Sequence, residues 1–419
     1  MMDESSIWAA ALLDILDVVP RYRLHREIAT MSPLELRRNA LEISKLYHMW
    51  TKRVAPPKSV TRHPLPVDAS RIDLLPGGAQ LLILTSKGDL QLYDFPGTFE
   101  LVASVARNDA LDIVPADAQL RRAKSPPSNL WAAVASPFRT SPEREPDATE
   151  FRIFSITLDP SSLEITETFI LDGVCTEICA AGDLLIAITD CSQQQSCVIR
   201  KIRFPAAKDG SGGSQVIPID NDMINTRIAV VYPHILLMRC TSHLLIYGLD
   251  SIEDGDSPPV LASNRPGSTA GSITACLSRY QDAWVPTHYY QNVGSRVTEG
   301  IRFVSATGHA HDFDVPLDGP YALGESHTVT RVINFGAGGP VGFQCFASFI
   351  RHDNHVGYMR LGFREAPSPK HFTYIPLAGR TGFVREVGFD EETGRICAVF
   401  RPFNKKGLGP AEIIVANFR

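Results

Sequence analysis

The chain has no long apolar run and no strong surplus of charge of either sign. Its 419 residues include 41 Lys and Arg against 46 Asp and Glu, which gives a formal net charge of -5 at pH 7. A small negative charge provides no general attraction to phosphate backbones or anionic membranes. No apolar segment approaches the roughly 20 residues needed to cross a bilayer. We therefore expect neither nucleic acid nor a membrane as a partner.

The features of a secreted protein are also missing. The chain opens with acidic rather than basic residues, has no small-residue cleavage pattern, and contains no Asn-x-Ser/Thr acceptor for glycosylation. Its eight cysteines are scattered through strand-like segments, whereas disulfide frameworks belong to shorter secreted chains. We therefore expect an intracellular protein, cytoplasmic or nuclear, whose cysteines are small buried hydrophobic residues.

The sequence lacks the signatures of common enzyme classes. It has no Gly-x4-Gly-Lys-Ser/Thr loop for nucleotide phosphates and no Gly-x-Ser-x-Gly elbow of an α/β hydrolase. The glycine-rich segment 336–342 precedes strand-like residues 343–350, whereas a dinucleotide loop needs a following helix. The histidine clusters at 309–311 and 352–355 have no partners at a known ligand spacing. We assign no catalytic residue, no metal and no cofactor.

The chain does have a repeated β pattern. Residues 71–94 contain a strand, a Pro-Gly-Gly turn, the apolar strand Leu81–Leu84, a Lys-Gly-Asp turn and an alternating strand. This order is typical of WD-like propeller blades. Similar units begin near residues 70, 109, 174, 226, 273, 327 and 382. We predict an all-β fold, a β-propeller of about seven irregular WD-like blades with six as the alternative count, preceded by a short α-helical segment.

Two further features of the β region follow from composition. Segments rich in Pro, Gly, Ser or charge predict surface loops, and they lie at 121–128, 137–149, 208–214 and 251–272. The last blade is short of a strand, whereas residues 59–67 form a spare one. We predict that this spare strand pairs with residues 412–418, which would hide open sheet edges.

Helical periodicity is confined to the first fifty residues. A short helix is predicted over 7–19, and a second begins after the N-cap Ser32 and ends near Trp50. The second helix has an apolar stripe, which we expect to dock on the propeller: Leu36, Ala40, Ile43, Tyr47 and Trp50. The predicted organisation is a helical segment at 1–53, a proline linker at 54–58 and a propeller at 59–419.

These residues bear a resemblance to a known family. The helix that starts at Met31-Ser-Pro-Leu-Glu-Leu and ends at Leu46-Tyr-His-Met-Trp50, the linker, and the Leu-Leu-Pro-Gly-Gly turn within 71–95 resemble the F-box proteins of mushroom-forming fungi. In that family an F-box is followed by a helix ending in tryptophan and then by a propeller-like region. The resemblance covers about residues 7 to 105. It implies a substrate-recognition subunit of a cullin-type ubiquitin ligase.

The resemblance departs from the family at the N-terminal module. An F-box begins with a Leu-Pro-x-Glu-like segment and supplies three small helices that dock a Skp-type adaptor. In this chain Ser6-Ile-Trp8 resembles only the end of that module. We therefore expect a Skp-type adaptor to bind weakly or not at all.

Two functions are compatible with the sequence. The first is a non-enzymatic module that presents loops on a rigid ring to a protein partner. The second is a propeller enzyme, a hydrolase of the lactonase or glycosidase type, with a metal or paired carboxylates in the central channel. Acidic or histidine side chains that converge in the channel would favour the enzyme, and mixed polarity would favour the binding module.

The candidate partner-binding site is an aromatic cluster near residue 290. It consists of Trp284, His288, Tyr289 and Tyr290. Tryptophan and tyrosine often anchor protein interfaces because they bury a large area at a small entropic cost. Packing in the core or between blades is the alternative role of these side chains.

Overall fold

The computed structural model describes residues 4–18, 28–51, 57–202 and 214–219, with gaps at 66, 96, 98, 126–128, 142, 144 and 192–193. Between 227 and 390 it describes the strands named below, and residues 393, 395–404 and 407–417 complete the described part. From 227 to 385 the description concerns the backbone, together with the burial of Ile228 and Tyr247.

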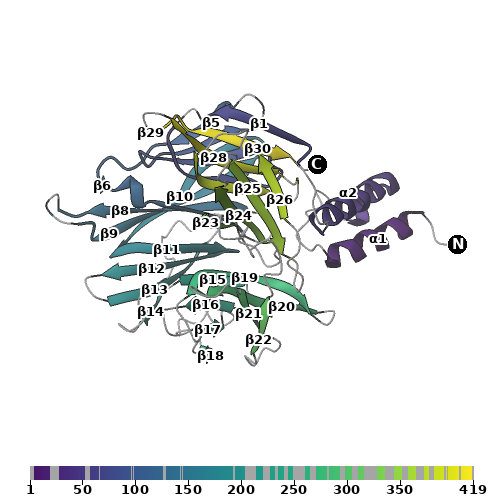
Figure 1. Ribbon diagram of the computed structural model, residues 1–419. Helices are drawn as coiled ribbons and strands as arrows, with labels where there is room; N and C mark the ends of the chain where they lie inside the picture. The colour runs from purple at the N-terminus through teal and green to yellow at the C-terminus, as the bar shows by residue number, and fades with distance from the viewer. Residues whose placement is uncertain are drawn as a thin grey trace.

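Two helices form a hairpin at the N-terminus, and they lie beside the sheets (Figure 1). They are α1 (Glu4–Val18) and α2 (Pro33–Thr51), and a 3-10 turn, η1 (Ile28–Thr30), precedes α2. The predicted capping box is present, because the Ser32 backbone N–H donates to Glu35 Oε2 at 2.8 Å and the Glu35 N–H donates to Ser32 Oγ at 3.3 Å. Among the described helices none is long and apolar enough to cross a membrane.

The apolar stripe of α2 packs on α1. Leu36, Ala40 and Ile43 are buried in one cluster with Leu12 of α1 and with Met31. The prediction that this stripe docks on the sheets is therefore wrong for these three residues. An amphipathic helix must bury its apolar stripe, and here the preceding helix, α1, provides the apolar surface. The side chains of Tyr47 and Trp50 lie outside the described part.

The rest of the chain forms seven antiparallel sheets, numbered here in chain order by their opening strand. Sheet 1 contains β2 (Ala69–Leu74), β3 (Gln80–Thr85), β4 (Leu90–Asp94) and β5 (Leu101–Val105). Sheet 2 contains β6 (Asp112–Ile113), β7 (Gln119–Ser125), β8 (Asn129–Arg139), β9 (Ala148–Leu158) and β10 (Ser161–Asp172). Sheet 3 contains β11 (Val174–Ala181), β12 (Leu184–Cys191), β13 (Gln194–Lys201) and β14 (Ser214–Ile219).

Sheets 4 to 7 continue the pattern. Sheet 4 contains β15 (Arg227–Val231), β16 (Ile235–Arg239), β17 (Leu244–Gly248) and β18 (Val260–Asn264). Sheet 5 contains β19 (Ala270–Tyr280), β20 (Ala283–Asn292), β21 (Thr298–Phe303) and β22 (Ala310–Val315). Sheet 6 contains β23 (Thr328–Phe335), β24 (Gln344–Arg351), β25 (Gly357–Arg364) and β26 (Phe372–Pro376). Sheet 7 contains β27 (Gly382–Asp390), β28 (Arg395–Asn404), β29 (Gly407–Leu408), β30 (Glu412–Asn417) and β1 (Ser59–Pro64).

The seven sheets match the predicted repeats. Their opening strands begin at residues 69, 112, 174, 227, 270, 328 and 382, each within a few residues of the predicted blade starts. Contacts join β23 to β27, β27 to β2, β2 to β7, β7 to β11, β11 to β15 and β15 to β19. The mostly β class and the sevenfold repetition are thus confirmed. The closure of the sheets into a ring stays a prediction.

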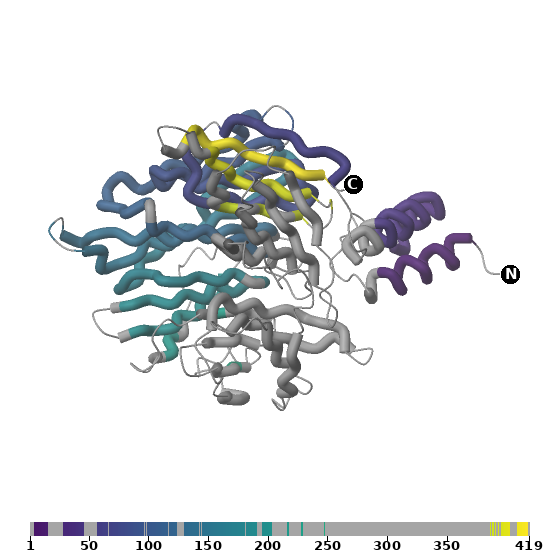
Figure 2. Tube along the Cα trace, in the orientation of Figure 1, coloured from purple at the N-terminus to yellow at the C-terminus, as the bar shows by residue number. Residues whose placement is uncertain are grey.

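Sheet 7 is built from both ends of the β region. β1 pairs antiparallel with β30, from Ser59 opposite Asn417 to Pro64 opposite Glu412, and the two segments lie side by side in Figures 1 and 2. A further backbone bond extends the pairing beyond the strand, because the Lys58 N–H donates to the Asn417 carbonyl at 2.7 Å. This pairing confirms the prediction for the spare N-terminal strand.

One predicted loop is a strand. Residues 121–128 were expected on the surface as a loop because of their charge, but β7 covers Gln119–Ser125 and pairs with β8. Leu120 and Ala123 of β7 are buried, and the arginines between them are held by neighbouring sheets, as described below. The predicted loop 251–272 likewise includes β18. The charged residues of this segment predicted a solvent-exposed loop. In the structure, groups of neighbouring sheets bind its arginines, so these arginines are compatible with a strand.

The core lies between the sheets. One cluster joins sheets 1 and 2 through leucines of β3 and β4 and apolar residues of β7 to β9, among them Phe154. A second joins sheets 2 and 3 around Trp131 and Phe151, and a third joins sheets 1 and 7 around Leu81 and Val415. Sheets 1 and 2 therefore bury both faces, which explains the continuous apolar runs of their central strands.

Candidate functional site

Paired charges join β2 of sheet 1 to β27 of sheet 7 and to β7 of sheet 2. On β2, Arg71 and Asp73 alternate with the buried Ile72 and Leu74. Arg71 Nη1 lies 3.1 Å from Glu386 Oε1 of β27, with the two side chains 30% and 20% exposed. Arg71, Asp73 and their oppositely charged partners on the neighbouring strands form a row of alternating charge. We call these residues the inner-strand charge row.

The row continues from β2 to β7. Arg122 Nε lies 3.2 Å from Asp73 Oδ2, with the two side chains 14% and 26% exposed. On the same strand, Arg121 Nε donates to the Ile178 carbonyl of β11 at 3.2 Å. Opposite charges at this separation compensate each other, and partial burial strengthens their attraction relative to bulk water.

Polar bonds also join β7 to β11 directly. Gln119 Nε2 donates to the Cys175 carbonyl at 3.3 Å, and the Ile178 backbone N–H donates to Gln119 Oε1 at 3.2 Å. One amide side chain thus satisfies two backbone groups of the neighbouring sheet. Side chains of β27, β2 and β7 thus hold sheets 7, 1, 2 and 3 in sequence.

Sheet 7 approaches sheet 1 closely at one glycine. A Cβ on Gly388 of β27 would lie 2.9 Å from Cys397 Sγ and 3.0 Å from the Leu74 backbone nitrogen of β2. Only glycine permits this spacing without a shift of the backbone. Asp68 and Arg401 form another ion pair between these two sheets.

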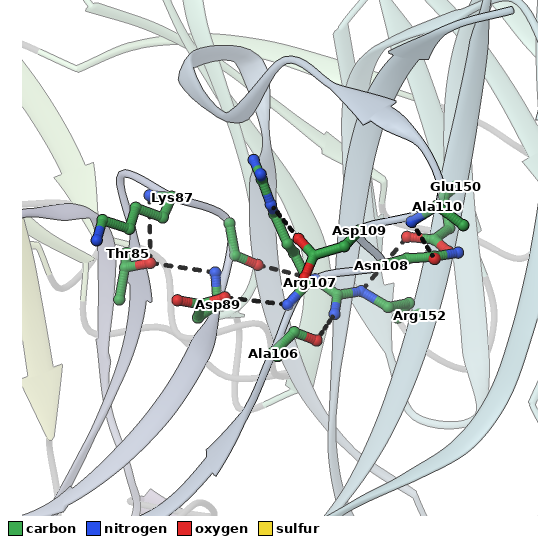
Figure 3. Close-up of polar contacts among 11 residues, drawn as sticks. Thr85, Lys87, Asp89, Ala106, Arg107, Asn108, Asp109, Ala110, Glu150 and Arg152 are labelled. Atoms are coloured by element: carbon green, nitrogen blue, oxygen red, sulfur yellow. Dashed lines mark hydrogen bonds and ion pairs between the residues drawn. The ribbon is translucent and has the colours of Figure 1, made fainter.

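A buried ion pair lies between sheets 1 and 2 (Figure 3). Glu150 and Arg152 of β9 are 1% and 2% exposed, and Arg152 Nε lies 3.6 Å from Glu150 Oε2. The guanidinium donates to two carbonyls of sheet 1, at Ala106 (2.7 Å) and Gly88 (2.9 Å). Burial lowers the pKa of Arg152, and the negative charges of Glu150 and Asp89 oppose this shift.

The same network holds two loops of sheet 1. Asn108 Nδ2 donates to Glu150 Oε1 at 2.9 Å. The Arg107 backbone N–H donates to Asp89 Oδ1 at 3.0 Å, and the Asp89 N–H donates to Thr85 Oγ1 at 3.1 Å. The β3–β4 turn and residues 106–110 are therefore fixed to β9 by side chains rather than by sheet pairing (Figure 3).

An aromatic stack of sheet 2 is contacted by an arginine of sheet 3. The rings of Phe151 and Phe169 are stacked with their centroids 5.1 Å apart. The guanidinium of Arg200 on β13 lies 4.2 Å from the Phe169 ring centroid, and its Nε donates to Glu167 Oε1 at 2.9 Å. This arrangement combines cation–π and ionic attraction at one junction.

The structure places the predicted aromatic cluster on β20. Pairing with β19 sets Trp284 opposite Arg279, His288 opposite Ala275, Tyr289 opposite Thr274 and Tyr290 opposite Ile273. The side chains of these four residues lie outside the described part, so their role as a binding site stays a prediction. The glycine-rich segment 336–342 and the histidine cluster at 352–355 also lie outside it, whereas His311 of β22 is opposite Arg302 of β21.

Four cysteines whose side chains the structure describes are free thiols. Cys175, Cys197 and Cys397 are buried and Cys179 is partly buried. Burial raises the pKa of Cys175 and of Cys397 to about 12 from 9.0. These residues confirm the prediction of small buried hydrophobic cysteines. Within the described residues, no group of three or more His, Cys, Asp or Glu could hold a metal ion.

The charge row and the buried network were only partly accessible to sequence reasoning. Arg71 and Asp73 alternate with apolar residues, which is typical of a half-buried strand, but this pattern does not indicate the ion pairs. Their partners lie far away in sequence, as with Glu386, and no local pattern connects such positions. A polar pair in an otherwise apolar strand, such as Glu150 and Arg152, is the one local signal that could have indicated the buried network.

Comparison with known proteins finds a likeness among solved structures. No family model and no curated protein matches the chain. Among solved structures, the WD40 domain of SCAP from fission yeast is similar with a TM-score of 0.48 and 7% sequence identity. The likeness covers 85% of this chain and 83% of that chain.

Proposed function

We propose that this chain is a non-enzymatic protein-interaction module whose seven sheets close into a seven-bladed propeller. The observation that supports it best is the inner-strand charge row. Arg71 with Glu386 and Asp73 with Arg122 bring positive and negative groups together in equal number. Such a row makes the strand surface mixed in polarity, which is the property expected of a binding module.

The alternative, a hydrolase of the lactonase or glycosidase type, needs a different arrangement. A pair of carboxylates that act as acid and base must have pKa values pushed apart by their surroundings. In the described row, Asp73 and Glu386 each form an ion pair with an arginine rather than facing another carboxylate. The pairing therefore supports binding over acid–base chemistry at these positions.

The network around Arg152 supports the same function. Binding surfaces are more effective when their loops are held in place before the partner arrives. Arg152, Asn108 and Asp89 hold the β3–β4 turn and residues 106–110 on β9. We assign these loops, together with the aromatic positions of β20, to the partner-binding surface.

Affinity purification with quantitative mass spectrometry tests this function. The full chain is compared with a variant in which Trp284, Tyr289 and Tyr290 are replaced by alanine, and with a control in which the exposed Leu101 is replaced by alanine. We expect a protein that the full chain and the control enrich and the triple variant does not. Hydrolysis of a lactone or glycoside panel that Asp73→Asn abolishes would contradict the proposal.

We further propose that the chain belongs with the F-box proteins of mushroom-forming fungi and serves as a recognition part with little adaptor affinity. The α1–α2 hairpin supports weak adaptor binding, because the apolar stripe of α2 is already buried against α1. In the described part of the hairpin, a free adaptor would meet the smaller outer faces of the two helices. A titration with a Skp-type adaptor, described in the Discussion, tests this point.

A further inference from the structure

The outer strand of sheet 2 forms a long sheet edge. β10 contains 12 residues, whereas the outer strands of the other six sheets, which are β1, β5, β14, β18, β22 and β26, contain five or six. β9 pairs with β10 along one side. Within the described residues, no backbone hydrogen bond joins β10 to any other segment. The backbone N–H and C=O groups on its other side can therefore pair with a further strand.

β10 has few of the features that usually protect an edge strand from such pairing. Short length, lysine and proline are the common ones, and the sequence of β10 contains no Lys, Arg, Pro or Gly. It does contain one bulge at Thr166, which separates the paired residues Ile165 and Glu167. The Thr166 hydroxyl donates to the Ile153 carbonyl at 3.2 Å. The bulge divides β10 into residues 161–165 and residues 167–172.

The first half of β10 is already in contact with sheet 1. Leu163 is buried in the cluster that joins sheets 1 and 2, and Gln80 of β3 donates a hydrogen bond to the Ser161 hydroxyl. Residues 161–165 therefore have less free surface than the second half.

The second half, residues 167–172, is covered on one face only, and we call it the open half of β10. Phe169 and Leu171 pack against the cluster that joins sheets 2 and 3. The residues that alternate with them, Thr168, Ile170 and Asp172, are exposed. Ile170 is 52% exposed although it is a large apolar residue. The open half thus has a free edge and one free face that carries an apolar side chain.

The charge around this edge is of one sign. Residues 153–199 contain seven Asp or Glu and no Lys or Arg. Asp159, Glu164 and Asp172 are exposed in or next to β10, whereas Glu167 accepts a hydrogen bond from Arg200. A second copy of this chain would place the same acidic strand against the edge, and like charges oppose such pairing. A basic partner is favoured instead.

From this edge, its free face and its charge we infer that the open half of β10 binds an extended basic segment of another protein, which adds a strand to sheet 2. The backbone of this segment pairs with β10, an apolar side chain covers Ile170, and Lys or Arg side chains lie near Glu164 and Asp172. The inference rests on the proposed interaction function. It gives that function a partner chemistry and a surface separate from the aromatic positions of β20.

Selection from a library of linear twelve-residue peptides displayed on phage, with the full chain as target, tests the inference. We expect enriched peptides that alternate apolar and basic residues, and fluorescence anisotropy measures the Kd of the most enriched one. Ile170→Lys should weaken its binding by about tenfold or more, because a lysine on the edge repels a basic strand. Leu101→Lys is the matched control and should leave the Kd within about twofold.

Leu101 is a suitable control because it resembles Ile170 in exposure but faces elsewhere. It is also 52% exposed and lies on the outer strand of sheet 1. It is opposite Tyr93, which belongs to the cluster between sheets 1 and 7. Residues opposite each other in a sheet share a face, so Leu101 lies on the side of sheet 1 away from sheet 2.

Methylation of the peptide backbone distinguishes strand addition from binding through side chains alone. In an added strand, the N–H groups of alternate residues point toward β10 and the others point away. Methylating the nitrogens of one alternate set should therefore weaken binding by about 100-fold or more, whereas methylating the other set should change the Kd by less than about threefold.

A charge exchange tests the role of the acidic residues. Glu164→Lys combined with Asp172→Lys should weaken binding of the enriched peptide by about tenfold or more. A peptide in which glutamate replaces each Lys and Arg should show the reverse preference and bind this double variant more tightly than the natural chain. Both positions are exposed, so the double variant should keep the melting temperature of the natural chain.

Four outcomes would overturn the inference: no peptide is enriched, Ile170→Lys binds the enriched peptide as well as Leu101→Lys does, both methylated sets weaken binding equally, or the chain dimerises through Ile170. If the variant of Trp284, Tyr289 and Tyr290 still loses a protein partner, any of these outcomes removes the β10 site alone and leaves the proposed interaction function standing.

Discussion

The indole Nε1 of Trp131 donates a hydrogen bond of 2.7 Å to the backbone carbonyl of Gly182. Trp131 lies on β8 of sheet 2 and is fully buried, whereas Gly182 lies in the turn between β11 and β12 of sheet 3. One side chain thus fills the space between two sheets and also satisfies a buried carbonyl of the second sheet. Loss of the indole removes both contributions.

We predict that Trp131→Phe lowers the free energy of unfolding by about 1 to 3 kcal/mol, because the Gly182 carbonyl loses its donor. Trp131→Ala should cost about 3 to 5 kcal/mol, since it also leaves a cavity. Urea unfolding followed by circular dichroism measures both values. Leu101→Ala on the exposed side of β5 is the control, and a Trp131→Phe variant no less stable than this control would contradict the assignment.

The second prediction concerns the buried pair Glu150 and Arg152. Arg152→Met should cost about 3 to 5 kcal/mol, because it leaves the Glu150 charge buried without compensation. Combining it with Glu150→Leu should cost less than the sum of the two single changes, since neither charge remains. Denaturant unfolding of the four proteins of this cycle gives the coupling energy. Additive single changes would show that the two side chains act independently.

The third prediction concerns alkaline stability. The pKa of Cys175 and Cys397 is about 12 in the folded chain, against 9.0 for an unperturbed thiol. Above pH 9 the unfolded chain loses these protons while the folded chain keeps them, so the free energy of unfolding should fall as pH rises from about 9 to 12. Replacing both cysteines with alanine should make this decline less steep in unfolding measured across that range. A decline of equal slope would assign the effect to other groups.

The fourth prediction tests the pairing of β1 with β30. Deleting residues 1–65 should lower the melting temperature and promote aggregation, because β30 then becomes an unprotected sheet edge. Deleting residues 1–57 removes the helices and keeps β1, so it should leave the melting temperature of the sheets close to that of the full chain. Differential scanning calorimetry compares the three proteins. Equal melting of both truncated chains would mean that β1 contributes nothing to the sheets.

The fifth prediction concerns a Skp-type adaptor. We expect calorimetric titration of the full chain to give a Kd weaker than about 1 μM, because the outer helix faces are small for a stable interface. Leu34→Glu combined with Leu41→Glu serves as the variant that removes α2's outer stripe. Sub-micromolar binding by the full chain would contradict the expectation, and its loss in the variant would locate the adaptor on α2.

Local patterns predicted much of the fold because they report on each strand's own burial. The capping box at Ser32, the continuous apolar run at Leu81 to Leu84 and the spare strand before Val67 all depend on neighbouring residues and turn chemistry. The strand β7 was missed because its arginines are neutralised by groups such as Asp73, 49 positions earlier in the sequence. The docking of α2 was misassigned because a stripe specifies an apolar partner but not which one.

The candidate site was less predictable than the fold. The charge row and the pair Glu150–Arg152 arise where different sheets meet, so their geometry depends on how the sheets are placed. The aromatic cluster at Trp284 was chosen by residue type alone, and only its position on β20 is now known. Sequence thus indicated which strands are half-buried but not which polar groups they bring together.

The pairing of β1 with β30 also means that β1 is synthesised long before its partner strand. Ser59 and Asn417 are joined by a side-chain hydrogen bond, and 358 positions separate them along the chain. At the usual 5 to 20 residues per second, a ribosome needs roughly 20 to 70 s to make the intervening chain. Throughout that time β1 has no partner strand, and its backbone groups are open to other chains. A chaperone that shields this segment during translation would therefore matter more for yield than one that acts on the finished protein.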